Sequence, residues 1–116
     1  MDFFGTSSRS FVRVFKSAAS TSSTNSPITI TLAAVTGARH YIVGFLWSYS
    51  DAPIGRISTT GLDGDQMDFD ITTSGPGPVL TPPAVGTLSG AVGITLSAGG
   101  AGVVGKLTIW YATVPQ

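Results

Sequence analysis

The chain has 116 residues, of which 10% are charged and 42% are hydrophobic, and its formal net charge is zero. This length suits one domain with a single hydrophobic core. The composition excludes a disordered polypeptide, which combines low hydrophobicity with high charge, and the lack of cysteine excludes a disulfide scaffold and a thiolate metal site.

Charged residues are scarce in comparison with ordinary soluble domains, in which they make up about 25% of all residues. Residues 71–105 contain none, yet prolines and glycines interrupt this segment too often for a membrane-spanning helix. A protein without net charge associates readily with other copies. We therefore expect much of its surface to be buried between subunits. The alternative is a monomer whose surface is coated with serine and threonine.

The chain divides into an N-terminal arm and a body. Residues 11–15 form a short β-rich run in the arm. Residues 17–26 are rich in Ser, Thr and Ala and end before Pro27, which is typical of a flexible linker. The sequence therefore predicts an arm with its linker at residues 1–26 and a folded body at residues 27–116.

The body alternates apolar and polar residues with the period of two that is typical of β-strands. Strands are predicted at residues 28–32, 40–49, 54–60, 66–72, 79–81, 91–97 and 103–114. Residues 40–49 are apolar on both faces, which predicts a central strand covered on both sides, whereas Pro82 and Pro83 make residues 79–81 an edge strand or an extended segment. With the run in the arm, about eight strands and no helix predict an all-β, antiparallel β-sandwich that is jelly-roll-like and has an extended N-terminal arm.

Enzymatic chemistry has little support in this composition. Residues 100–105 (GAGVVG) match a dinucleotide-binding fingerprint, but they lead into a β-rich segment, so we interpret them as a hairpin turn. His40 is the only histidine and glutamate is absent, so the usual acid–base pairs cannot be assembled. We expect His40 to be a half-exposed structural residue, and the protein to be no enzyme and to use no cofactor.

Four aspartates lie close together in the middle of the chain. They are Asp63, Asp65, Asp68 and Asp70. They could hold a weakly bound cation, but the segment lacks the glycine and the distal glutamate of an EF-hand loop. Asp63-Gly64 is a favoured hairpin dipeptide. Asp68 and Asp70 alternate with Met67, Phe69 and Ile71, so we expect the two aspartates on the outward face of a strand and the three apolar residues on its inward face. A solvated turn and strand face is therefore preferred over a weak cation site.

Aromatic residues offer a binding hypothesis. Strict alternation places Tyr41, Phe45, Trp47 and Tyr49 on one face of a strand, and Trp110 lies near the C-terminus. If exposed, Trp47, Tyr49 and Trp110 could stack on sugar rings. Large aromatic residues in a central strand more often form a core or a subunit interface, which is the preferred interpretation.

The arm offers a docking hypothesis. Its phenylalanines and basic residues are separated by small polar residues; they are Phe3, Phe4, Arg9, Phe11, Arg13 and Phe15. Burial of one phenylalanine stabilises by roughly 1.5–3 kcal/mol, so exposed rings are unfavourable. We expect the arm to add to a neighbouring subunit that buries these rings, with Arg9 and Arg13 making charge contacts. A frayed terminus is the alternative.

Residues 39–45 (RHYIVGF) and residues 96–107 (LSAGGAGVVGKL) resemble small β-jelly-roll virion proteins of tailed bacteriophages. The resemblance covers about residues 28–114 and concerns the general composition and the glycine-rich hairpin. It implies a protein that decorates a capsid or builds a fibre or tail attachment, often as a trimer. It assigns no catalytic or binding residue.

The sequence therefore predicts a structural virion protein, a capsid decoration protein that self-associates, with a trimer favoured. Its partner would be the major capsid protein or another virion protein. A carbohydrate-binding or receptor-binding module of a phage fibre or tail is the alternative. The basic residues are too few for a nucleic-acid partner. No signal peptide or transmembrane segment is recognisable, so we expect assembly in the host cytoplasm, localisation to the virion and no membrane partner.

Overall fold

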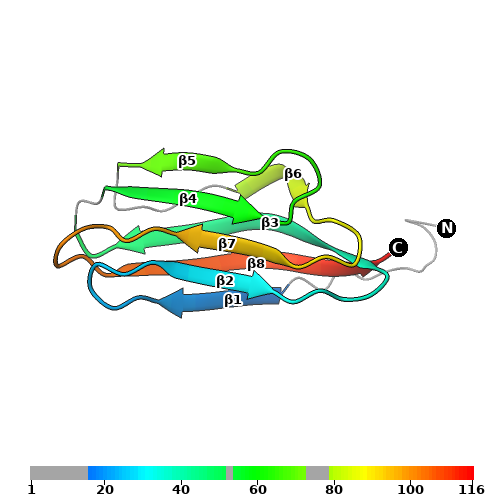
Figure 1. Ribbon diagram of the computed structural model, residues 1–116, viewed down its shortest axis with the longest axis horizontal. Helices are drawn as coiled ribbons and strands as arrows, with labels where there is room; N and C mark the ends of the chain where they lie inside the picture. The colour runs from blue at the N-terminus through cyan, green and yellow to red at the C-terminus, as the bar shows by residue number, and fades with distance from the viewer. Residues whose placement is uncertain (1–15, 52–53, 73–78) are drawn as a thin grey trace.

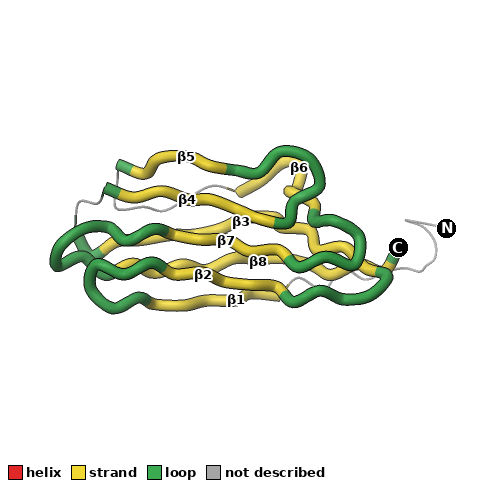
Figure 2. The backbone as a smooth tube through the Cα atoms, in the orientation of Figure 1, coloured by secondary structure: helices red, strands yellow, loops and turns green. Residues whose placement is uncertain are grey.

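The protein is a β-sandwich in the part of the chain that its computed structural model describes: residues 16–51, 54–72 and 79–116, with only the backbone described at 79–82 (Figure 1). The strands are β1 (Lys16–Thr21), β2 (Ile28–Leu32), β3 (Ala38–Tyr49), β4 (Gly55–Thr60), β5 (Asp68–Ile71), β6 (Val79–Val85), β7 (Val92–Leu96) and β8 (Gly105–Pro115). Within these residues there is no helix, and loops alone join the strands (Figure 2).

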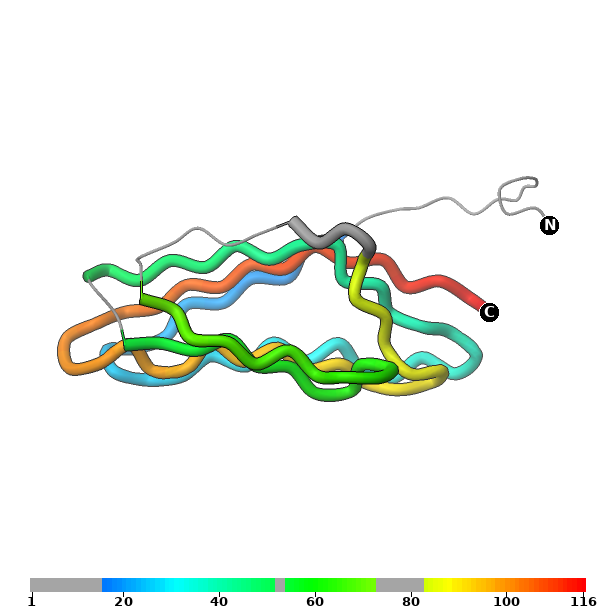
Figure 3. Tube along the Cα trace, turned by 90° about the horizontal axis from the view of Figure 1, so that it is seen from above, coloured from blue at the N-terminus to red at the C-terminus, as the bar shows by residue number. Residues whose placement is uncertain are grey.

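The strands form two antiparallel sheets, ordered β1-β8-β3-β6 and β2-β7-β4-β5. Seen from above, the two sheets lie one over the other as separate layers (Figure 3). Strands pair in a nested order, β1 with β8, β2 with β7, β3 with β6 and β4 with β5. A long antiparallel hairpin folded over itself produces this order, which is the jelly-roll topology. The predicted fold class is thereby confirmed, while the arm at residues 1–15 lies outside the described residues.

β1 occupies part of the segment that the sequence predicted to be a linker. Lys16–Thr21 pairs residue by residue with the β8 segment from Lys106 to Tyr111. Ala18 packs against the core. Serine and alanine have little preference for strands, so this strand forms because β8 supplies its hydrogen-bonding partner and the core supplies an apolar contact. The strand predicted at residues 11–15 lies outside the described residues.

A β-bulge in β3 changes which of its side chains face the core. The register with both neighbouring strands shifts between Ile42 and Gly44. As a result Ile42 and Phe45, three positions apart, are both fully buried. An inserted residue of this kind reverses the alternation beyond it. The prediction of one aromatic face was therefore wrong for Tyr41, which lies on the outer side of the sheet.

The core lies between the two sheets and continues along the whole sandwich. Its buried members are Ile28, Ile30, Leu32, Ile42, Phe45, Trp47, Tyr49, Ile57, Leu62, Ile71, Val92, Ile94, Leu96, Val103, Leu107 and Ile109. Met67 and Phe69 pack against it from the β5 segment, so the predicted inward face of that segment is confirmed. β3 is central in its sheet, as predicted, but Leu46 on its outer side is 41% exposed, so the strand is not covered on both sides.

Tyr49, at the end of β3, packs against the first residues of β4 and β8 and against the loop that follows β7. Its hydroxyl donates a hydrogen bond to the Ser97 carbonyl oxygen, 2.9 Å away. A Cβ atom added at Gly55 or Gly99 would overlap the tyrosine side chain, so both positions require glycine. Burial raises the pKa of the Tyr49 phenol above its ordinary value of 10.0. The folded protein therefore retains the phenolic proton at a higher pH than the unfolded chain does.

Tyr49→Phe should lower the free energy of unfolding by about 1–2 kcal/mol at neutral pH, because the Ser97 carbonyl loses its donor. The wild type should also lose stability as the pH rises above about 10, since the unfolded chain releases the phenolic proton first. Urea unfolding at several pH values measures both effects. The variant should lack this alkaline loss, and Tyr41→Phe, on the outer side of β3, is the matched control that should keep it. Identical alkaline losses in all three proteins would contradict this assignment.

Candidate functional site

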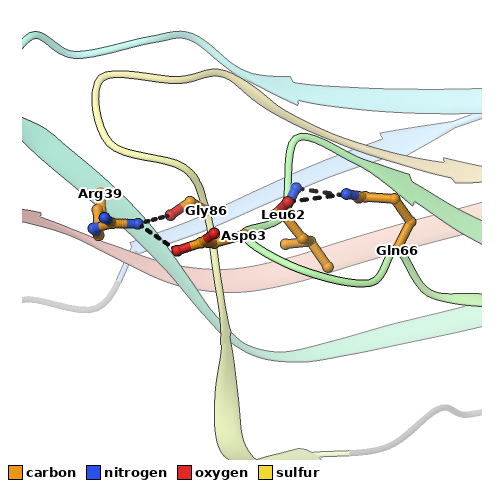
Figure 4. Close-up of polar contacts among 5 residues, drawn as sticks. All are labelled: Arg39, Leu62, Asp63, Gln66 and Gly86. Carbon is orange, nitrogen blue, oxygen red and sulfur yellow. Dashed lines mark hydrogen bonds and ion pairs between the residues drawn. The ribbon is translucent and has the colours of Figure 1, made fainter.

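The first aspartate of the acidic segment is part of a structural turn between β4 and β5. Arg39 Nη1 donates to Asp63 Oδ2 at 3.1 Å and to the Gly86 carbonyl oxygen at 3.0 Å (Figure 4). The Gln66 side chain accepts from the Leu62 N–H at 3.1 Å and donates to the Leu62 carbonyl oxygen at 2.9 Å. These contacts fix the turn against the start of β3, so the predicted turn around Asp63 is confirmed.

The two aspartates of β5 are paired with one arginine on the neighbouring strand. Arg56 Nε lies 3.3 Å from Asp68 Oδ1 and 3.5 Å from Asp70 Oδ1. All three side chains are more than half exposed on the outer side of the sheet. Exposed ion pairs of this type stabilise by less than about 1 kcal/mol each, so this group mainly neutralises charge at the sheet edge.

The four aspartates do not form one cation site in the structure. Asp63 pairs with an arginine of β3, whereas Asp68 and Asp70 pair with an arginine of β4. Among the described residues, no group of three or more His, Asp or Glu side chains could hold a metal ion. The geometry therefore favours the solvated turn and strand face over the weak cation site for Asp63, Asp65, Asp68 and Asp70.

His40 is buried, so the prediction of a half-exposed histidine was wrong. It is 4% exposed because it lies inside β3, where the alternation points it toward the core with Ile42. Its Nε2 lies 2.8 Å from the Ala33 carbonyl oxygen and its Nδ1 lies 2.8 Å from Thr113 Oγ1. A carbonyl only accepts, so Nε2 carries the hydrogen and, in the neutral ring, Nδ1 accepts from the threonine hydroxyl. Both nitrogens are thus used to join β3 to its neighbours.

Two of the three residues considered for glycan stacking are part of the core. Trp47 is 8% exposed, and its ring centroid lies 6.1 Å from that of Phe45 and 6.0 Å from that of Phe69. Tyr49 is also buried. The preferred core interpretation is confirmed for these two residues, which cannot stack on a ligand in this conformation. The indole Nε1 of Trp47 is buried and has no hydrogen-bond partner in the described structure.

Trp110 is the accessible member of the three. It is 40% exposed on the outer side of the sheet β1-β8-β3-β6, where it lies opposite Ser17 of β1 and Gly44 of β3. These small neighbours cover little of the indole. The next outward row contains Ala19, Thr108 and Leu46. We call these six residues the Trp110 patch.

Leu46 is a part of this patch that the sequence did not reveal. It was predicted to be covered, because residues 40–49 are apolar on both faces, but it is 41% exposed. It lies one row from Trp110 on the adjacent strand, a diagonal arrangement in which large side chains reach one another. Alternation places Leu46 on the face opposite Trp47, but no sequence signal shows that this face is exposed, because both faces of residues 40–49 are apolar.

The outer side of the other sheet is polar where β2 and β7 meet. Thr29 and Thr95 lie opposite one another and their Oγ1 atoms are 2.9 Å apart. Ser58 of β4 and Asp68 of β5 continue the same row across the sheet. The two outer faces of the sandwich therefore differ: one has hydroxyl groups and ion pairs, and the other has the Trp110 patch.

The glycine-rich segment at residues 100–105 makes a turn that leads from β7 into β8, but these strands lie in different sheets, so the turn connects the two layers and the prediction of a hairpin was wrong. Gly100 and Gly102 have φ values of 118° and 74°, which favour glycine. The Val103 N–H donates to the Gly100 carbonyl oxygen at 3.1 Å and closes the turn. No helix begins at this turn, so the segment lacks the helix N-terminus that a dinucleotide site requires.

The docking residues predicted in the arm lie outside the described residues. They are Phe3, Phe4, Arg9, Phe11, Arg13 and Phe15. In the part of the chain that is described, no helix has the length and apolar character needed to cross a membrane. No family model, curated protein or solved structure matches the chain.

Arg39→Gln should lower the free energy of unfolding by about 1–2 kcal/mol, because the buried Gly86 carbonyl and Asp63 both lose their charged donor. Arg56→Gln is the matched control, since it removes only exposed ion pairs and should cost less than about 1 kcal/mol. Urea unfolding of both variants measures the difference. Equal losses would contradict the structural role assigned to the Arg39 contacts.

Proposed function

We propose that this chain is a structural subunit of a virion, which associates with further copies and cements a capsid surface or another virion protein. The observation that best supports this function is the Trp110 patch, where a tryptophan and a leucine are both about two-fifths exposed on a sheet face. Large exposed apolar groups that lie together are typical of protein–protein contacts. The arm at residues 1–15 is assigned to the same role in this proposal.

The surroundings of the patch favour a protein partner over water. Its two rows contain Ser17, Ala19 and Thr108 beside the large residues, and no charged side chain. A partner could therefore cover the patch without removing a charge from water, which would be unfavourable. Burial of Trp110 and Leu46 would each stabilise a contact by roughly 1.5–3 kcal/mol. The chain as a whole has few charges to oppose such contacts.

Jelly rolls serve many functions, so the proposal is argued from the patch, and the fold agrees with it. The nested eight-strand topology is the one implied by the resemblance to small virion proteins. Two broad and rigid sheet faces suit packing against flat protein surfaces. The polar outer side with Thr29 and Thr95 would then remain in water.

Purified virions of the phage that encodes the chain should contain it in a fixed copy number. Trp110→Ser combined with Leu46→Ser should reduce its occupancy on the particle several-fold, because the patch loses its apolar area. The thermal midpoint of unfolding should change little, since both side chains are partly exposed. Quantitative mass spectrometry of particles measures the occupancy.

Thr31→Ser, on the polar outer side of the other sheet, is the matched control and should leave occupancy unchanged. Absence of the wild-type chain from the particle would contradict the proposed function. Unchanged occupancy of the double variant would show that the patch is not the docking surface.

A second function is favoured by the open position of Trp110. An indole flanked by Gly44 and Ser17 can stack on a sugar ring from the outer side of the sheet. Such stacking would make the chain a carbohydrate-binding or receptor-binding module.

This second function predicts that a bound glycan shifts the tryptophan fluorescence in a saturable way. The change would come from Trp110, because Trp47 is buried. Trp110→Phe should abolish the shift while it preserves the fold. No shift across a broad glycan panel would exclude the function and leave the patch to a protein partner.

A further inference from the structure

β1 is the edge strand of its sheet, and its outer edge is unpaired. In the described part of the chain β1 forms a ladder with β8 on one side and with no strand on the other. β2 lies beside it in the other layer and is likewise the edge strand of its own sheet (Figure 1). One long side of the sandwich thus consists of two edge strands.

The residues of β1 that offer backbone groups to this free edge follow from the register. The Ser22 N–H donates to the Gly105 carbonyl oxygen at 2.9 Å, just beyond the end of β1. In an antiparallel ladder every second residue shares this orientation, and the residues between them point their N–H and C=O groups the other way. The residues that face the free edge are therefore Ser17, Ala19 and Thr21.

Within the described residues, this edge has few of the features with which proteins prevent strand addition. Such features are proline, charged side chains, bulges or a covering segment. The edges on the opposite side of the sandwich have them: β6 contains Pro82 and Pro83, and β5 contains Asp68 and Asp70. β1 has Lys16 at its first position and otherwise only serine, alanine and threonine.

The neighbouring edge strand β2 is equally unprotected. Its sequence ITITL contains no charge and no proline. Lys16 is therefore the one charged residue in the two strands, β1 and β2, that form this side of the sandwich. A strand that adds here meets small side chains and backbone groups that have no strand partner among the described residues, which is the arrangement used in β-strand addition.

We propose that β1 is the self-association site of this chain, where it pairs antiparallel with β1 of a second copy about a two-fold axis at Ala19. The proposal rests on the proposed function and specifies its self-association. Each strand would exchange backbone hydrogen bonds through Ser17, Ala19 and Thr21. The axis is perpendicular to the sheet, so two four-stranded sheets become one sheet of eight strands.

The sequence of β1 suits a second copy of itself. A two-fold contact is self-complementary, because the same residues serve on both sides. Ala19 would face Ala19 of the second copy, and these small side chains do not clash. Ser17 would lie opposite Thr21 of the second copy, a hydroxyl pair of the kind that stabilises antiparallel sheets. The antiparallel direction also places the two Lys16 ammonium groups at opposite ends of the contact, where they do not repel.

This pairing would place the two Trp110 patches on the same outer side of the continuous sheet. A two-fold axis perpendicular to a sheet leaves each face on its own side. The dimer would therefore present two identical patches to one surface. Two linked contacts bind a particle surface more tightly than either alone, because the second contact forms within the same complex.

Ala19→Pro in the full chain tests the pairing directly. Proline removes the N–H that faces the free edge and leaves the hydrogen bonds between β1 and β8 in place, as on natural edge strands. Light scattering coupled to size exclusion should give twice the 11.8 kDa chain mass for the wild type and one chain mass for the variant. Ala18→Pro is the matched control for orientation, because its N–H points toward β8, and it should lower the thermal midpoint of unfolding instead.

Ala19→Lys provides a second variant in case the proline prevents folding. It places two like charges across the axis, so it should be monomeric at low salt and should regain the dimer at high salt. Hydrogen exchange on the wild type adds a measurement without substitution. The amides of Ser17, Ala19 and Thr21 should be protected at high protein concentration and exchange quickly after dilution.

The outcomes separate this proposal from the function on which it rests. A wild-type monomer would overturn the pairing and the self-association, whereas the cementing role is tested separately by the occupancy of the chain on the particle. A trimer, which the sequence favours, would support self-association and overturn the two-fold pairing. A dimer that persists in both variants at position 19 would also overturn it. A dimer that both variants dissociate, with fold and thermal midpoint retained, would establish β1 as the contact.

Discussion

The pairing of β3 with β8 is the contact on which the other strands of the first sheet depend. It joins Ala38–Tyr49 to Gly105–Pro115 over nearly the full length of both strands. β1 and β6 are then added to the two outer sides of this pair. Because β8 is the last strand in the chain, the sheet cannot be completed until the whole body is present. Long-range pairing of this type carries a high entropic cost of loop closure, which the continuous core between the sheets offsets.

The bulge in this pairing decides which large side chains are available to a partner. Beyond the register shift between Ile42 and Gly44, Phe45 and Trp47 point inward and Leu46 points outward. Opposite the shift, Trp110 meets Gly44, which has no side chain to cover it. One inserted residue thus creates both the aromatic part of the core and the exposed patch on the outer face.

Local alternation predicted those strands whose pattern is regular, and β2 lies at residues 28–32 as expected. It failed where tertiary contacts override the local signal. The serine- and alanine-rich β1 exists because β8 supports it, and its sequence alone resembles a linker. The inward position of His40 depends on a bulge that leaves no mark in composition, and the exposure of Leu46 could not be recognised because both faces of its strand are apolar. Of the candidate sites, the turn at Asp63 followed from its dipeptide, whereas the Trp110 patch required the register of three strands.

The nested pairing also determines how the domain responds to mechanical load. The first residue of β1, Lys16, pairs with Tyr111 near the end of β8, so the described chain enters and leaves the sandwich on neighbouring strands at the same end. A force that separates these two points would act on the hydrogen bonds between β1 and β8 one after another. Bonds loaded in succession break at lower force than bonds sheared together. A tether attached through these two ends would therefore open the β1–β8 ladder by peeling rather than by shear.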